Sequence, residues 1–172
     1  LPTSVECLDT DSDTKRVTFS GTENLTWLDV PTQTVKMTHC PKLQELRWTG
    51  DTLSEKKLPC PVSDSTTLCS LSVKVDEIKE SFLFPTQLTS LSLQVHDQSV
   101  DVALLTPLTL LQSLDIDIDK DEDPLDLSEL TTLTRFYGNG TPLSRRPTSL
   151  VACTILLQSD FDFSSFTSLT SL

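Results

Sequence analysis

Several residue types are scarce in this sequence of 172 residues, which holds 4 glycines, 1 methionine and only two asparagines. This bias is stronger than in a typical enzyme domain. Basic residues are scarce as well: 13 lysines and arginines stand against 25 acidic residues, which gives a net charge of −12 and a pI of about 4.4. Non-specific binding to nucleic acid or to an anionic membrane needs a basic surface, so we expect neither of these partners.

No apolar run reaches the roughly 18 residues that span a bilayer, so we expect no membrane insertion. The chain begins at Leu1 without a methionine or a signal-peptide pattern, and it stops inside a patterned stretch, Phe166–Leu172. We therefore expect a fragment of a longer protein. The residues in excess are serine and threonine, at 46 positions, and leucine, at 30. With 37% hydrophobic residues the chain can build a core, and its length suits a single domain over residues 1–172.

An internal repeat of the form L-x-x-L-x-L runs through the chain and predicts one short buried strand in each copy. The clear copies are Leu25–Val30, Leu43–Trp48, Leu68–Val73, Leu88–Leu93, Leu111–Ile116, Leu133–Gly138 and Leu150–Ile155. A degraded first copy lies at Val5–Thr10, and a partial last copy begins at Phe166. The second leucine position recurs after 20, 18, 25, 20, 23, 22, 17 and 16 residues, at Leu8, Leu28, Leu46, Leu71, Leu91, Leu114, Phe136, Cys153 and Leu169.

Two further patterns accompany the repeat. A polar residue stands three positions after the last leucine position of each copy, at Asp13, Gln33, Asp51, Asp76, His96, Asp119, Thr141 and Gln158. A Pro-Thr-(Ser/Gln) leader precedes the first leucine position in Leu1–Val5, Phe84–Leu88 and Arg146–Leu150. With these features the chain resembles the leucine-rich repeat family over nearly its full length, and its leaders resemble the irregular repeats of BspA-like and related protozoan and bacterial proteins. The resemblance implies a right-handed solenoid that binds another macromolecule.

We therefore predict an α/β or mainly β solenoid, with a parallel sheet on its concave side and irregular connectors on its convex side. The second leucines should stack inside it, at Leu28, Leu46, Leu71, Leu91 and Leu114. Trp48 occupies an inward position of the repeat and is predicted to belong to the core.

The connectors carry weaker signals. Val17–Phe19 and Val35–Cys40 predict either a second short strand in each early coil or an extended convex segment. The connector over residues 97–107 has room for a turn of helix. The polar, proline-bounded segment 54–65 should form a protruding loop.

Alternation along the strands turns one set of polar and aromatic side chains outward. The candidate binding residues are Trp27, Asp29, Arg47, Asp115, Asp117, Arg135 and Tyr137. Trp, Tyr and Arg are frequent hot spots of binding, and the acidic pair favours a partner with a basic patch. We expect a protein-protein interaction module that binds a protein ligand through the concave face of the solenoid and uses no cofactor. Two alternatives stay open: a solvated face that binds nothing, and a structural or regulatory repeat segment attached to a catalytic domain outside this chain.

An aspartate series at residues 115, 117, 119, 121, 123 and 126 has the spacing of a calcium-binding loop. Lys120 stands where such a loop needs glycine, and Ile116 should point into the core, so an extended acidic patch is the favoured interpretation. His39 and His96 lack sequence partners for catalysis, and no G-x-S-x-G motif occurs. His39 and Cys40 are adjacent residues of metal-binding type, and a metal site would need further ligands from distant parts of the sequence. We expect no enzymatic activity and no metal ion.

The five cysteines, Cys7, Cys40, Cys60, Cys69 and Cys153, form an odd set without a C-x-x-C motif. Two of them fall on repeat positions that should be buried. Reduced thiols and a cytoplasmic location are favoured, with a Cys60–Cys69 disulfide and the cell surface as the alternative.

Two modification motifs are present. Both asparagines, Asn24 and Asn139, lie in N-x-T glycosylation sequons. The segment Arg145-Arg146-Pro147-Thr148 resembles the acceptor sequence of a basophilic protein kinase.

Overall fold

The leucine repeat forms strands wherever the structure describes it. The computed structural model describes residues 7–9, 17–19, 23–30, 35–37, 40–50, 52–53, 66–79, 82–96, 100–118, 125–139 and 143–156. In these residues the chain winds as a parallel β-solenoid whose only helix is a single 3-10 turn, η2 (Val102–Leu104). The mainly β form of the predicted fold class is therefore confirmed, and the helical turn lies in the connector that was predicted to have room for one.

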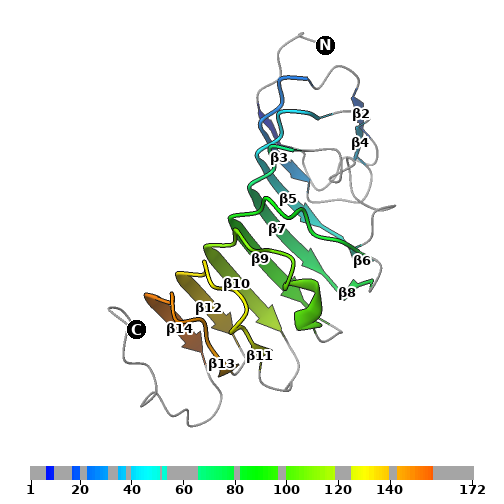
Figure 1. Cartoon of the computed structure of the whole chain (residues 1–172). Coiled ribbons are helices and arrows are strands. Elements are labelled where there is room, and N and C mark those ends of the chain that lie inside the picture. The colour runs from blue at the N-terminus through cyan, green and yellow to red at the C-terminus, as the bar shows by residue number, and fades with distance from the viewer. Residues whose placement is uncertain are drawn as a thin grey trace.

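Eight parallel strands form one main sheet, in which neighbours along the repeat are also neighbours in space (Figure 1). They are β1 (Cys7–Asp9), β3 (Trp27–Val30), β5 (Glu45–Thr49), β7 (Ser70–Val75), β9 (Ser90–Val95), β10 (Ser113–Ile118), β12 (Arg135–Asn139) and β14 (Ala152–Leu156). Each strand comes from one copy of the repeat, so the sheet grows by one strand with each coil of the solenoid.

The second leucine position sets the register of the main sheet. Leu91 pairs with Leu71 on one side and with Leu114 on the other. The same column continues to Leu8, Leu28 and Leu46 in one direction and to Phe136 and Cys153 in the other. The unequal lengths of the coils are therefore absorbed by the connectors, and the strands stay in register.

The inner face of the main sheet is apolar and buried. The second leucines that were predicted to stack are at most 1% exposed: Leu28, Leu46, Leu71, Leu91 and Leu114. The first leucines are at most 1% exposed as well: Leu25, Leu43, Leu68, Leu88, Leu111, Leu133 and Leu150. Folding removes the side chains of these two columns from water. This burial stabilises the fold by roughly 25 cal/mol for each Å² of apolar surface.

Trp48 extends this core and is 2% exposed, as predicted. Its indole N–H has no hydrogen-bond partner among the described residues. A Cβ atom placed on Gly50 would lie 2.4 Å from the Trp48 ring, so only glycine leaves room for the indole at this point. The Gly50 N–H donates to the Lys74 carbonyl of the next coil at 2.9 Å.

A second set of short strands follows the main strands. β2 (Val17–Phe19) pairs with β4 (Val35–Met37), β6 (Thr52–Leu53) with β8 (Glu77–Ile78), and β11 (Leu125–Asp126) with β13 (Leu143–Arg145), all parallel. In Figure 1 these pairs lie beyond the arrowheads of the main strands. The early coils therefore carry two strands each, as one of the two predictions has it, and later coils add shorter pairs that the sequence did not predict.

A tight turn precedes five of the main strands, β5, β9, β10, β12 and β14. The N–H of the first leucine donates to the carbonyl three residues earlier, at 2.9–3.3 Å, in the pairs Leu43–Cys40, Leu88–Pro85, Leu111–Leu108, Leu133–Leu130 and Leu150–Pro147. All five acceptor residues are buried. The proline of two Pro-Thr-(Ser/Gln) leaders therefore has a place: it opens the turn and contributes its ring to the core. The leader at Leu1–Val5 lies outside the described residues.

Backbone bonds connect the coils at this turn. The residue after the first leucine offers its carbonyl to two N–H groups of the next coil, as Gln112 does to Thr134 (2.9 Å) and Arg135 (3.0 Å). The Thr134 hydroxyl donates to the same carbonyl at 3.1 Å. The Thr89 hydroxyl makes the equivalent bond to Cys69, again at 3.1 Å.

The residue before the first leucine supplies a second hydroxyl. The Thr132 hydroxyl lies 2.8 Å from the carbonyls of both Thr109 and Leu111. Thr67 bonds in the same way to Pro41 and Leu43, and Ser149 bonds to Leu133. Part of the serine and threonine excess therefore joins one coil to the next, by satisfying carbonyls that the main sheet leaves open.

Three predictions concern residues outside the described part of the chain: the loop over residues 54–65, the side chain of His39 and the partial last copy from Phe166. Among the described residues, none of the helical structure has the length and apolar character needed to cross a membrane.

Candidate binding face

The face of the main sheet opposite the core is named the outer face here, and three columns of side chains cross it. The first holds Trp27, Glu45, Ser70, Ser90, Ser113, Arg135 and Ala152. The second holds Asp29, Arg47, Ser72, Ser92, Asp115, Tyr137 and Thr154, and the third holds Thr49, Lys74, Gln94, Asp117 and Asn139. Every one of these residues is half-buried or exposed. All seven candidate binding residues thus lie on one face.

The outer face changes along the solenoid. The central strands β7 and β9 present small hydroxyl side chains, at Ser70, Ser72, Ser90 and Ser92. Larger groups stand toward the two ends: Trp27 and Arg47 on β3 and β5, Arg135 and Tyr137 on β12. Tyr137 is 39% exposed although it is a large aromatic residue. The structure therefore separates the aromatic and arginine candidates into two groups rather than gathering them at one point.

A hydrogen-bonded network occupies the outer face between β9 and β12. Asp117 accepts bonds from Gln94 Nε2 (3.1 Å, to Oδ2) and from Asn139 Nδ2 (2.8 Å, to Oδ1). Asp115 accepts a bond from the Ser92 hydroxyl at 3.2 Å. Gln94 and Asn139 were not among the predicted site residues, although the repeat alignment places both in the column of Asp117. That shared column was the available signal.

Neutral partners surround both carboxylates. The cross-strand neighbours of Asp115 are Ser92 and Tyr137, and those of Asp117 are Gln94 and Asn139. Partial burial raises the pKa of the Asp115 carboxyl, the Ser92 hydrogen bond opposes this, and the charge of Asp117 adds to it. The direct cross-strand neighbours of the two carboxylates therefore carry no charge that would neutralise them.

Charge is balanced differently near the start of the sheet. Arg47 Nε lies 3.3 Å from Glu45 Oε1 within strand β5, and Asp29 is the cross-strand neighbour of Arg47. Both members of the Arg47–Glu45 pair are solvent-exposed, so the contact adds little to stability.

At the first two aspartates of the calcium-loop spacing the chain is extended, as the acidic-patch interpretation expects. Asp115 and Asp117 lie in strand β10 and Asp126 in strand β11, whereas Asp119, Asp121 and Asp123 lie outside the described residues. In the described part of the chain no group of three or more His, Cys, Asp and Glu side chains is arranged to hold a metal ion.

In the part of the chain that the structure describes, three cysteines are thiols outside any disulfide: Cys40 and Cys153, which are buried as predicted, and Cys69. The Cys69 thiol lies 3.4 Å from the Gln44 carbonyl, at the position where Thr89 and Thr134 place their hydroxyls. Cys60, the alternative partner of Cys69, lies outside the described residues. Burial raises the pKa of Cys153 to about 11, and nearby Arg146 partly opposes this.

The two sequon asparagines differ in their surroundings. Asn24 lies in a turn, where its Oδ1 accepts a bond from Lys42 Nζ at 2.7 Å. Asn139 lies in strand β12 and uses its amide nitrogen to bond Asp117. The amide of Asn139 is thus part of the outer-face network.

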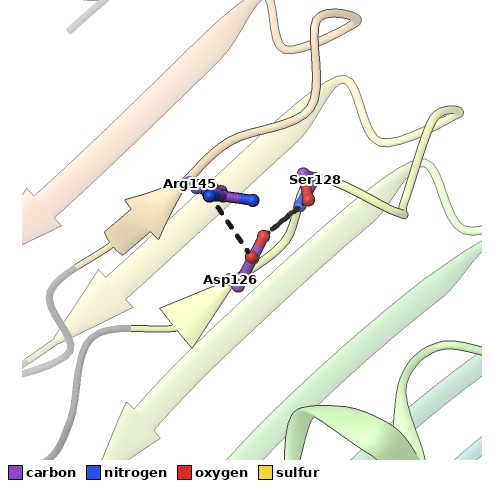
Figure 2. Close-up of polar contacts among 3 residues, drawn as sticks. All are labelled: Asp126, Ser128 and Arg145. Carbon is purple, nitrogen blue, oxygen red and sulfur yellow. Dashed lines mark hydrogen bonds and ion pairs between the residues drawn. The ribbon is translucent and has the colours of Figure 1, made fainter.

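A second polar cluster, away from the outer face, was not predicted from the sequence. Asp126 Oδ1 accepts bonds from the Ser128 hydroxyl (2.6 Å) and the Ser128 N–H (3.0 Å), as Figure 2 shows. Arg145, from the paired strand β13, extends toward Asp126 with Nε 3.9 Å from Oδ2 (Figure 2). The Ser128 hydroxyl, then its N–H, and finally Arg145 lower the pKa of Asp126.

The fold thus defines a parallel β-solenoid whose main sheet has one buried and one accessible face. No family model, curated protein or solved structure matches the chain.

Proposed function

We propose that this chain is a protein-interaction module of the leucine-rich repeat type, which binds a protein ligand through the outer face of its main sheet. The observation that carries the proposal is the accessible patch on β10 and β12. There Asp115 and Asp117 have only neutral cross-strand neighbours, and Arg135 and Tyr137 are exposed beside them. A partner that brings a basic group to this patch would gain charge complementarity and an aromatic contact together.

The leucine-rich repeat assignment has support from the coil itself. Each coil places an L-x-x-L-x-L segment in the main sheet and returns through a variable connector. Cys40 is buried at the turn before β5, where other coils have proline or leucine. A solenoid of this kind offers an extended surface formed by many coils, which suits contact with another macromolecule.

Binding accounts for the patch better than catalysis does. Among the described residues, the Asp115 and Asp117 carboxylates bond to Ser92, Gln94 and Asn139, rather than to a histidine or cysteine that could act with them in proton transfer or nucleophilic attack. The two amide donors, Gln94 and Asn139, hold the Asp117 carboxylate in one orientation on the outer face.

The test begins with affinity capture of partners on the immobilised chain, followed by titration of each purified partner. The double variant Arg135→Ala/Tyr137→Ala should weaken binding by roughly tenfold or more. The on-rate of the unaltered chain should fall as salt is raised.

The matched control is Glu129→Ala/Thr131→Ala, in an exposed connector and turn away from the outer face. It removes one charged side chain and one polar side chain and should leave the affinity unchanged. If the control weakens binding and the Arg135/Tyr137 variant does not, the outer face is not the binding surface.

A further inference from the structure

Four threonines occupy the same position in the turns before four main strands, and one of them, Thr148, differs from the others in the residues that precede it. Thr86, Thr109, Thr131 and Thr148 each follow directly the carbonyl that accepts the turn hydrogen bond, and all four are exposed. Within the described residues none of their hydroxyls makes a hydrogen bond. The four sites therefore share backbone geometry and accessibility.

The four threonines differ in the residues that stand two and three positions before them. Thr148 follows Arg145 and Arg146, whereas the equivalent pairs are Leu83-Phe84 before Thr86, Thr106-Pro107 before Thr109, and Ser128-Glu129 before Thr131. Arginine at these two positions is what basophilic protein kinases recognise, because carboxylates in the kinase groove form charge-assisted bonds with guanidinium groups. We propose that Thr148 is a phosphorylation site for an arginine-directed protein kinase.

The surroundings of Arg145 suit this recognition. Its side chain is 75% exposed, and its contact with Asp126 is long, at 3.9 Å. Asp126 already accepts two bonds from Ser128 (Figure 2), so it stays hydrogen-bonded when Arg145 turns toward another carboxylate. The backbone leading to the site is extended through strand β13, and Pro147 holds Arg146 in extended geometry.

The neighbouring hydroxyl is not an equivalent acceptor. Ser149 donates to the Leu133 carbonyl at 2.7 Å and joins two coils, whereas the Thr148 side chain faces solvent. A kinase binds its substrate as an extended segment, so the turn bond from Leu150 to Pro147, at 3.3 Å, opens when the site is engaged.

The reaction transfers one phosphoryl group from ATP. The Thr148 hydroxyl oxygen attacks the γ-phosphorus, and the bond from this phosphorus to the β–γ bridging oxygen breaks. ADP leaves, and the hydroxyl proton passes to the catalytic carboxylate of the kinase. In the product, the phosphate on Thr148 lies close in sequence to the Arg145 and Arg146 guanidinium groups. Their positive charge favours the added negative charge.

The experiment incubates the folded chain with the catalytic subunit of cAMP-dependent protein kinase, an arginine-directed enzyme, and Mg-ATP. Phosphate is located by tandem mass spectrometry. We expect it on Thr148 and not on Thr86, Thr109 or Thr131. Thr148→Ala should abolish the signal, and Arg145→Gln/Arg146→Gln should lower the initial rate by roughly tenfold or more. Lys79→Gln, which removes an exposed cation elsewhere, should leave the rate unchanged.

A gain-of-function variant keeps the test independent of lost stability. Leu83 is 71% exposed, so Leu83→Arg introduces arginine three residues before Thr86 without disturbing the core, and Thr86 should become a second acceptor. A synthetic peptide of residues 143–152 serves as the unfolded reference. The proposal is overturned if the folded chain takes up no phosphate on Thr148, whether or not the peptide is phosphorylated, or if all four threonines react at equal rates.

Discussion

The inner and outer faces of the main sheet come from alternate residues of the same strands, yet different requirements shape them. In β9, Leu91, Leu93 and Val95 are buried, while Ser92 and Gln94 between them are accessible. The inner residues of successive strands are nearly all apolar and fill one continuous core. The outer residues change along the solenoid: they are mostly aromatic or charged on β3 and β5, mostly small hydroxyl residues on β7 and β9, mostly acidic on β10, and arginine and tyrosine on β12. The inner face thus holds the strands in register, which leaves the outer face free to vary.

The largest effect should come from opening a cavity in the inner face. Replacing Leu91 by Ala should lower the free energy of unfolding by roughly 2–5 kcal/mol, because the coils on both sides lose the same packing partner. Ser90→Ala, in the same strand but on the outer face, should change it by less than about 0.5 kcal/mol. Denaturant titration measures both, and equal effects would contradict the division between the faces.

A smaller effect is expected where the core meets the edge of a strand. Gly50→Ala puts a methyl group against the Trp48 ring and should destabilise the chain by roughly 1–3 kcal/mol. In a Trp48→Leu background the same substitution should lose most of its effect, because the clash is gone. Additive effects in this double-mutant cycle would show that the indole is not the obstacle.

The hydroxyls that join the coils should contribute less per residue. Thr132→Val keeps the shape of the side chain but removes a hydroxyl shared by two carbonyls, and should lower stability by about 1 kcal/mol. Thr131→Val, one residue earlier and exposed, is the matched control and should have almost no effect. Thermal melting of the two variants separates them, and coincident curves would remove the structural role assigned to Thr132.

The smallest effect is expected from a substitution on the outer face, which should raise stability rather than lower it. The pKa of Asp115 is raised in the folded chain, so its ionised form opposes folding, and its contribution to stability falls as the pH rises through that pKa. Asp115→Asn should therefore raise stability at neutral pH, by no more than roughly 1 kcal/mol for a partly exposed group. The gain should disappear in acid, below the ordinary value of 3.8.

Asp126→Asn provides the contrast for that measurement. Its pKa is lowered in the folded chain, so its carboxylate stabilises the fold above its unfolded pKa, and this stabilisation is lost as the pH falls through the folded value. The asparagine variant should thus be less stable than the parent at neutral pH. Two variants that shift stability in the same direction would be inconsistent with the surroundings described for these carboxylates.

The repeat predicted the main sheet because its signal is the burial pattern itself. Leu28, Leu46 and Leu71 occupy equivalent places in sequence and in space, and a shift of one residue would have turned them toward solvent. Even Cys153, which replaces leucine, was placed in the right column. Strands such as Thr52–Leu53 and Glu77–Ile78 were missed because two residues show no periodicity.

Polar contacts between coils were harder to predict. Thr67, Thr132 and Ser149 look alike in a chain rich in hydroxyls, and only their shared place before the first leucine distinguishes them. The contact between Asp126 and Arg145 depends on the pairing of two short strands, which the sequence does not reveal. For the outer face, alternation predicted which side chains turn outward, whereas the bonds of Gln94 and Asn139 to Asp117 required the cross-strand neighbours to be known.

The in-register ladder also determines which insertions and deletions this chain can tolerate during evolution. The coil from Leu46 to Leu71 takes 25 residues and the coil from Phe136 to Cys153 takes 17, yet both deliver the next strand to the same register. Residues gained or lost in a connector are therefore compatible with every other coil. A single residue inserted between the first and second leucines would have a different result, because it would turn the serines and aspartates of that strand inward and its leucines outward. Connectors can thus diverge in length between related chains, while the spacing of the two leucines cannot.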